Sequence, residues 1–264
     1  KVFFTSGGSD SIDTALKMSR KYWALRGKPS KKVIVFRENG YHGMHAGGTS
    51  IAGIGPNNDG YSELVEDVVQ VPWDDAEEMI ATIDRIGEDN IAAFFCEPIQ
   101  GAGGVRIPPD LYLQTVRKAC AERNILFVAD EVQTGIARTG KLIACEHEGV
   151  KPDILILGKA VSGGLYPVSC VLTSHDIMDV IHPGEHGSTF GGNPLAAKVA
   201  VAALEVVEDE KLSQNARILG ELFRTEMRKL VAKSDLLHKV RGKGLLNAII
   251  INDSPNSTTA WDLC

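Results

Sequence analysis

Three short segments of the sequence carry residues that could do chemistry together. They are the glycine-rich turn Ser6–Asp10, the acidic pair Asp130–Glu131, and Lys159. Each follows an apolar run of the kind that forms a buried strand. In an open α/β sheet, ligands lie beyond the carboxyl ends of the strands, so residues at strand ends are the first candidates for a site.

The turn Ser6–Asp10 has the properties of a site for a single phosphate group. Glycines let the backbone approach an anion, and the start of a helix offers free N–H groups and the positive end of its dipole. Ser9 could add a hydroxyl hydrogen bond. The segment lacks the G-x-G-x-x-G pattern of dinucleotide-binding folds. Alone, it could equally be a tight turn whose helix is capped by Ser9 or Asp10.

Asp130 and Lys159 together indicate a functional site more strongly than either residue does alone. A carboxylate at the end of the apolar run 125–129 is costly unless it meets a cation or a hydrogen-bond donor. A lysine just after the run 153–157 can act as a nucleophile where loss of solvent disfavours its ammonium form. Singly, either could be a salt-bridge partner or a surface group. With a phosphate turn they match pyridoxal phosphate (PLP), which needs an anion site, a partner for its ring nitrogen and an amine for a Schiff base.

Six motifs along the chain resemble those of the class III aminotransferases and occur in the order typical of that family. They are 6–10 (SGGSD), 41–43 (YHG), 97–101 (EPIQG), 127–135 (FVADEVQTG), 157–164 (LGKAVSGG) and 187–194 (GSTFGGNP). The spacing between Asp130 and Lys159 is also similar to that of the family, and the resemblance covers essentially the whole chain. It implies PLP as the cofactor.

The resemblance assigns residues to the parts of this cofactor. Gly8 and Ser9 would hold the phosphate, and Tyr41 would stack on the pyridine ring, where an aromatic face supplies contact area. Val132 would pack beneath the ring. Gln133 would hydrogen-bond the ring hydroxyl.

The resemblance also assigns the residues closest to the reaction. Asp130 would keep the ring nitrogen protonated, and Lys159 would form the Schiff base and then act as the general base and acid of the proton transfer. Glu97 would lie near the substrate side of the site and help to set the charge environment there. Thr189 would reach the phosphate bound to the neighbouring subunit, which implies a homodimer.

The substrate is less tightly indicated than the reaction. From Gln133 onward the chain resembles the ornithine aminotransferases, whereas Tyr41–Gly43 and Gly101–Val105 resemble ω-amino acid:pyruvate enzymes. Ala102 stands where ornithine aminotransferases carry an acidic residue that switches between donor and acceptor. We expect transfer of the terminal amino group of an ω-amino donor, with ornithine and 2-oxoglutarate giving glutamate semialdehyde as the first choice. The alternatives are an ω-amino acid:pyruvate aminotransferase and a catalytically silent aminotransferase fragment.

Alternating apolar runs and helical patterns predict an α/β fold. Strands are expected at 2–5, 33–36, 91–96, 125–129, 153–157 and 167–173, and helices at 11–23, 76–86 and 108–123. Because the runs do not alternate with polar residues, they favour a mostly parallel sheet covered by helices on both faces. The resemblance identifies this as the large domain of a fold-type-I PLP-transferase, at residues 1–235. Residues 236–264 would begin a small C-terminal α/β domain.

The long helical pattern from 193 to 233 is expected to contribute to the core. Its apolar residues Leu204, Val207, Leu219 and Leu222 are interpreted as core positions and not as a partner surface. At the ends, the chain opens without methionine inside a strand-like run, and 260–264 resembles the first turn of a helix. We therefore expect an excerpt of a longer chain. A glycosylation-acceptor pattern at 256–258 carries little weight without a secretory route.

Composition limits the classes of partner. The net charge is −6, which argues against a nucleic acid or an anionic membrane as partner, since both require clustered Lys and Arg. No apolar run approaches the roughly 20 residues of a membrane span. The five cysteines are scattered, which predicts reduced thiols and an intracellular location, cytoplasmic or in the mitochondrial matrix. Cys145 and His147 are too isolated to predict a metal site.

Overall fold

The computed structural model describes residues 1–62, 64–252 and 260. The pattern at 256–258, Cys264 and the predicted helical turn at 260–264, apart from Ala260, lie outside these residues. The four other cysteines are buried free thiols.

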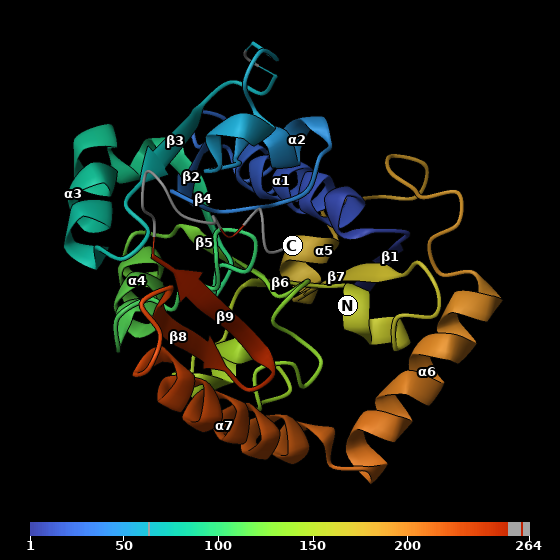
Figure 1. Ribbon diagram of the computed structural model, residues 1–264. Coiled ribbons are helices and arrows are strands. Elements are labelled where there is room, and N and C mark those ends of the chain that lie inside the picture. The colour runs from blue at the N-terminus through green and yellow to red at the C-terminus, as the bar shows by residue number, and fades with distance from the viewer. Residues whose placement is uncertain (63, 253–259, 261–264) are drawn as a thin grey trace.

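A seven-stranded sheet forms the centre of the structure (Figure 1), with the strand order β1-β7-β6-β5-β4-β2-β3. The strands are β1 (Val2–Thr5), β2 (Val33–Arg37), β3 (Val68–Val71), β4 (Ile91–Cys96), β5 (Leu126–Asp130), β6 (Ile154–Leu157) and β7 (Ser169–Thr173). Only β7 pairs antiparallel with its neighbours, β1 and β6, and the other pairs are parallel. The predicted α/β class with a mostly parallel sheet is confirmed.

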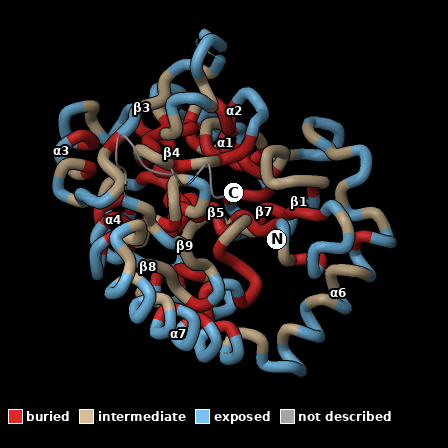
Figure 2. The backbone as a smooth tube through the Cα atoms, in the orientation of Figure 1, coloured by how far each residue is buried: buried red, intermediate tan, exposed pale blue. Residues whose placement is uncertain are grey.

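Helices cover both faces of this sheet, as the apolar runs require. On one face, α1 (Gly8–Ala24) packs Ile12 and Leu16 into a cluster with Phe95 and Val128. On the other face, α3 (Ala76–Ile86) and α4 (Tyr112–Glu122) pack against the alternate side chains of β4 and β5. Every residue of β4 and β5 is buried (Figure 2), which explains why these strands carry no polar alternation.

Local backbone chemistry shifts some predicted boundaries. Helix α4 begins at Tyr112 and not at the proline pair near 108, because Leu111 takes a left-handed conformation with φ of 67° that a helix cannot continue through. The edge strand β3 and the short helix α2 (Ala46–Ser50) were not predicted. The remaining short segments are α5 (His175–Met178) and the 3₁₀ turns Gly55–Asn57, Glu88–Asn90, Ala144–His147 and Lys159–Ser162.

The predicted helical stretch from 193 to 233 forms two helices. These are α6 (Pro194–Asp209) and α7 (Leu212–Val231), separated at Lys211, whose φ is 53°. A hairpin of β8 (Leu237–Lys243) and β9 (Leu246–Ile251) follows and packs on α7 (Figure 1). The hairpin begins just after residue 235, and the domain boundary at 235/236 stays a prediction.

The interpretation of the apolar residues of α6 and α7 as core is wrong for three of the four: Leu204 is 39% exposed, Leu219 42% and Leu222 56%. Val207 is half-buried and packs against the cluster that contains Leu157 and Val161. Figure 2 shows both helices mostly in the colours of exposed and intermediate residues. Helical periodicity reports that a face is apolar, but whether another element covers that face depends on the tertiary arrangement.

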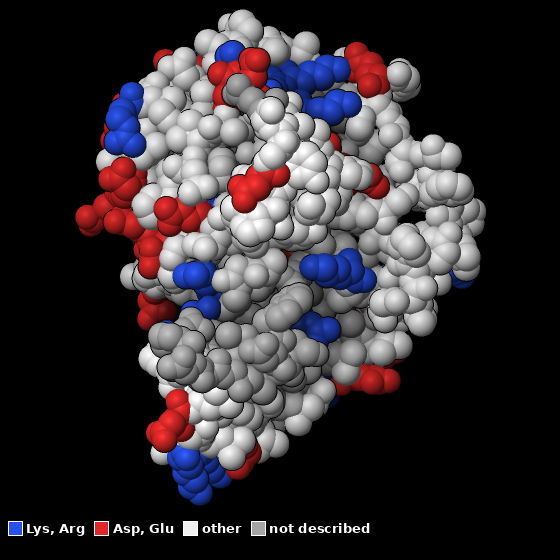
Figure 3. Space-filling view, turned by 45° about the horizontal axis from the view of Figure 1, so that its top comes forward, with Lys and Arg blue, Asp and Glu red and all other residues white. Residues whose placement is uncertain are grey.

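The surface is mixed in charge. On the face in Figure 3, Lys and Arg gather in small groups, and no continuous basic stripe crosses the side chains that are drawn there. No helix within the described part of the chain combines the length and apolarity needed to cross a bilayer.

Candidate active site

A cavity of about 250 Å³ opens at the carboxyl ends of β5 and β6. The structure brings every predicted site residue except Thr189 to its wall. These residues are Gly8, Ser9, Tyr41, Glu97, Asp130, Val132, Gln133 and Lys159. The convergence follows from the parallel sheet, whose strands end at one common edge.

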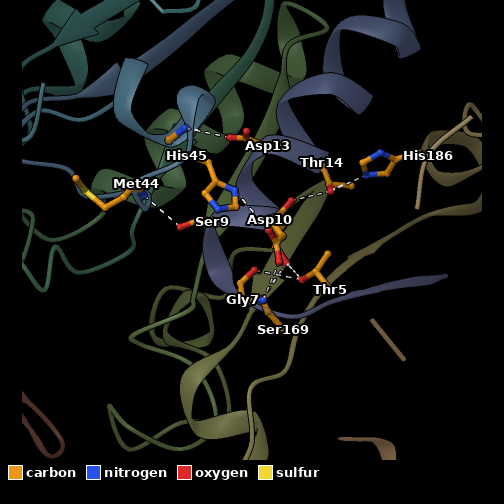
Figure 4. A network of polar contacts seen from close by, with 12 residues as sticks. Thr5, Gly7, Ser9, Asp10, Asp13, Thr14, Met44, His45, Ser169 and His186 are labelled. Atoms are coloured by element: carbon orange, nitrogen blue, oxygen red, sulfur yellow. Dashed lines mark hydrogen bonds and ion pairs between the residues drawn. The ribbon is translucent and has the colours of Figure 1, made fainter. Parts of the chain in front are cut away.

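The glycine-rich turn forms the start of helix α1. Gly7 is the N-cap, and its N–H donates to Oδ2 of Asp10 at 3.2 Å. Ser9 does not cap the helix, because its Oγ accepts a hydrogen bond from the Met44 N–H at 3.2 Å (Figure 4). A Cβ on Gly8 would lie 3.1 Å from Cγ1 of Val132, so a larger residue at position 8 would press on the cavity wall. The turn therefore offers backbone N–H groups to a ligand at the positive end of α1.

Asp130 is held by a partner that the sequence analysis did not single out. Nδ1 of His42 lies 2.8 Å from Oδ2 of Asp130, and the Val132 N–H donates to Oδ1 at 3.1 Å. A carboxylate can only accept, so Nδ1 of His42 carries the proton in this pair. His42 is buried, and its Nε2 has no partner within the described residues. Its position inside the motif Tyr41–Gly43 was the available signal.

Glu97 is almost fully buried and is fixed by two backbone amides. The Tyr41 N–H donates to Oε1 at 2.9 Å, and the Gly101 N–H donates to Oε2 at 3.0 Å. Burial raises the pKa of the Glu97 carboxyl, while His42 and the two amides act in the opposite direction. The side chain is thus a preorganised acceptor at the edge of the cavity. Ala102, on the adjoining turn, is exposed and places no charge there.

Lys159 lies at the mouth of the cavity and not in a desolvated pocket. Lys159 is exposed, whereas the sequence predicted a lysine shielded from solvent at the end of a strand. Its backbone has φ of 45°, a conformation that costs a non-glycine residue on the order of 1 kcal/mol or more. The side chain also borders a second, more open cavity of about 880 Å³ formed with the segment Ser162–Pro167. The strained turn aims a flexible amine at the junction of the two cavities.

Thr189 is not brought to this cavity. It is exposed and lines a separate cavity of about 390 Å³, together with Asp10, His45 and His186. Its predicted contact with a phosphate in a neighbouring subunit stays a prediction. No cluster of three or more His, Cys, Asp or Glu that could hold a metal ion occurs within the described residues.

Glu131 anchors the segment that carries Val132 and Gln133. Its fully buried carboxylate accepts hydrogen bonds from Oγ1 of Thr134 at 2.5 Å and from the N–H groups of Ala144 and Cys145, both at 2.8 Å. Burial raises the pKa of this carboxyl, and the three hydrogen bonds lower it. These bonds close the segment from 131 to 145 into one unit.

We expect Glu131→Ala to lower the free energy of unfolding by about 2–5 kcal/mol, because it leaves two buried amides unpaired. Denaturant unfolding followed by fluorescence measures this. The matched control is Glu146→Ala, an exposed residue of the adjoining 3₁₀ turn, which should change stability by less than about 0.5 kcal/mol. Equal effects of the two changes would contradict the anchoring role.

Comparison with known proteins places the chain among characterised relatives. The family model described as Aminotransferase class-III matches residues 1–264. The mitochondrial ornithine aminotransferase of Drosophila ananassae is 45% identical over all of this chain, and the chain spans 60% of that relative's length.

Solved structures agree in fold. The acetylornithine aminotransferase of Elizabethkingia anophelis has a TM-score of 0.86 and 50% identity, covering 100% of this chain and 63% of its own. An ornithine aminotransferase of Toxoplasma gondii, described with PLP at partial occupancy in its active site, has a TM-score of 0.89 and 39% identity, covering 96% and 60%. This similarity confirms the predicted fold-type-I architecture.

Proposed function

Because the chain belongs to the class III aminotransferases, we propose that it is the cofactor-binding part of a PLP-dependent transaminase. The observation that carries this proposal is the single cavity that Lys159, Asp130 and the Gly8–Ser9 turn line together. The chain spans about 60% of the length of its curated relatives, so activity, substrates and partners are proposed for the whole protein.

The residues of the cavity fit this cofactor. The wall includes the start of helix α1, whose first backbone N–H groups can donate to a phosphate. It also offers an anion, Asp130, whose pairing with His42 keeps it aimed at the cavity. The amine of Lys159 borders the same space. These three features are an anion site, a partner for a protonated ring nitrogen and a nucleophile, which are the groups that PLP needs.

Each residue then has a definite task. When bound, PLP supplies an electron-withdrawing ring that stabilises negative charge at the substrate carbon. Asp130 would hold the proton on the ring nitrogen. Lys159 Nζ would be the amine that holds the cofactor and would move the proton at the substrate carbon.

The other cavity residues hold the ring in place. Gly8 and Ser9 would bind the phosphate through N–H and hydroxyl groups. Tyr41 and Val132 would pack on the ring, and Gln133 would hydrogen-bond its hydroxyl. Because transfer of a proton needs a fixed angle between ring and substrate, these contacts determine which bond is activated.

Gly101 leaves the space that the Gln133 amide occupies. A Cβ on Gly101 would fall 1.6 Å from Oε1 of Gln133, so Gly101→Ala must displace that amide. We expect PLP affinity to fall about tenfold with little loss of folding stability, since the displaced group is the end of a flexible side chain. Cofactor titration and thermal unfolding measure both. Gly55→Ala, whose Cβ meets no atom within 4 Å, is the control. Unchanged affinity in Gly101→Ala would contradict the role given to Gln133.

For the substrates we propose ornithine as donor and 2-oxoglutarate as acceptor, which gives glutamate semialdehyde. The names of curated relatives at about 45% identity support this choice. Ala102 is exposed and carries no charge where ornithine aminotransferases have an acidic residue. This difference favours the second candidate, an ω-amino acid:pyruvate aminotransferase.

We further propose a homodimer, in which Thr189 contributes to the site of the neighbouring subunit. A mitochondrial location is proposed from relatives such as that of Drosophila ananassae, and a cytoplasmic one is the alternative that scattered reduced cysteines allow.

The test is the visible absorption spectrum of the purified protein with PLP, before and after amines are added. A bound-cofactor band that ornithine bleaches supports the first choice, and bleaching by β-alanine alone supports the second. Bleaching by N-acetylornithine but not by ornithine would show that the preferred donor has no free α-amino group. A folded protein that binds PLP but responds to no amine supports the catalytically silent alternative. Absence of any band contradicts the proposed cofactor site.

A further inference from the structure

The segment that carries Thr189 is tied to the fold at two points on either side of that residue. On one side, the ring of His186 contacts α1 through Thr14 and Lys17 and stacks on Phe3, with ring centroids 5.0 Å apart. On the other side, Gly191 packs so closely on β1 that a Cβ would lie 2.2 Å from the carbonyl oxygen of Phe4. Figure 4 shows His186 beside Thr14 of α1. Thr189 is therefore placed by contacts that its neighbours in the chain make.

The hydrogen bonds around His186 require one tautomer of its ring. Lys17 Nζ, 3.1 Å from Nδ1, can only donate, so Nδ1 must accept. Oγ1 of Thr14 donates its proton to the carbonyl oxygen of Asp10 at 2.7 Å, so it must accept from His186 Nε2 at 2.9 Å. The Thr14 contact places a proton on Nε2, and the Lys17 contact leaves Nδ1 without one, so together they give the neutral Nε2–H ring.

Other charged groups near His186 are engaged elsewhere. Asp10 accepts from the Gly7 N–H and lies 3.4 Å from His45, and Asp13 accepts from the Gly48 N–H at 3.2 Å. Lys17 is thus the charge that His186 meets directly. The groups that surround the ring are Lys17, Lys21, Asp10, Asp13, His45 and Glu185, of which Glu185 pairs with Lys21. Burial, and then Lys17, lower the pKa of His186, in agreement with a neutral ring.

We propose that His186, as its neutral Nε2–H tautomer, is a positioning residue that fixes the Thr189 segment on helix α1. This helix also starts at the Gly8–Ser9 turn, so α1 would hold both the turn for this subunit's phosphate and the segment whose Thr189 is proposed to serve the neighbouring subunit's phosphate. The part of the inference that concerns the cofactor rests on the proposed function. The placement of the segment by His186 does not.

The ring state and the segment can be tested without any cofactor. Nitrogen-15 NMR of the imidazole, with His186→Gln to assign its signals, should show Nε2–H at neutral pH. Hydrogen exchange of residues 182–192, corrected for the intrinsic rate, should be at least about tenfold faster in His186→Leu. It should be unchanged in His182→Leu, an exposed histidine of the same segment. An Nδ1–H tautomer, a protonated ring at pH 7, or equal exchange in the two leucine variants would overturn the proposal.

The dependence on pH gives a second test that simple loss of packing would not reproduce. Below the lowered pKa the ring gains a proton on Nδ1, which then faces the Lys17 ammonium, so the segment should loosen as pH falls. Lys17→Met removes this repulsion and should move the NMR titration of His186 to higher pH, whereas Lys118→Met on α4 should not. If the pH at which His186 titrates were the same with and without Lys17, the assignment would be overturned.

Cofactor affinity extends the test to the proposed function. A PLP affinity about tenfold weaker in His186→Leu would show that placing the segment also matters for cofactor binding. Unchanged affinity would limit His186 to placing the segment and would count against the role proposed for Thr189.

Discussion

Replacing Lys159 with alanine is expected to lower kcat/KM for transamination on the order of 10⁴-fold. The change removes both the nucleophile that binds the cofactor and the group that moves the proton, and general acid–base catalysis alone contributes roughly 10²- to 10⁴-fold. Folding should be preserved, because Lys159 is exposed and its side chain makes no hydrogen bond within the described structure. Steady-state kinetics with ornithine and 2-oxoglutarate measure the loss, and the visible spectrum should lack the band of lysine-bound PLP.

Two further variants separate chemistry from charge. Lys159→Arg keeps a cation at the cavity mouth but supplies no nucleophilic amine, so it should be as inactive as Lys159→Ala. Lys141→Ala, an exposed lysine elsewhere on the surface, should be fully active. Substantial activity in Lys159→Arg would mean that the lysine acts only through its charge, and the proposed mechanism would be wrong.

Asp130→Asn is expected to lower kcat/KM by roughly 10²- to 10³-fold. The amide keeps the size of the side chain but cannot hold a proton on the ring nitrogen, so the preorganised charge that stabilises the reacting carbon is lost. The variant should still fold, because the amide oxygen can accept from Nδ1 of His42 or from the Val132 N–H. Kinetics together with PLP titration distinguish a loss of turnover from a loss of binding.

The contact between His42 and Asp130 predicts which of the two substitutions lowers kcat/KM more. His42→Gln should cost less than Asp130→Asn, because Asp130 retains its charge and its bond to the Val132 amide. Asp176→Asn, whose side chain is 80% exposed, should be kinetically silent. If His42→Gln were more damaging than Asp130→Asn, the histidine and not the aspartate would be the group that acts on the cofactor.

The sequence alone was sufficient to predict the central sheet and the residues at its edge. Long apolar runs without alternation occur where a strand is buried on both faces, so β4, β5 and β6 were recognisable from local pattern. Asp130 and Lys159 follow such runs directly, and parallel strands end at one edge. Their approach to a common cavity was therefore a consequence of topology that local pattern could predict.

Other features depended on contacts between distant parts of the chain. His42 meets Asp130 across 88 residues, and Glu131 turns inward to bind the amides of Ala144 and Cys145. No local pattern distinguishes such a carboxylate from a surface one. A buried polar group is stable only when its partners come from elements that the fold brings together.

The same reason explains two of the expectations that the structure changed. Lys159 follows a buried strand, yet a strained turn carries it out to the cavity mouth, where it is exposed. Helices α6 and α7 have the periodicity of core helices, yet much of their apolar face is exposed. Sequence therefore determined which residues prefer burial and where strands end. Only the tertiary structure decided which of them are covered, because coverage is a property of the neighbouring element and not of the residue itself.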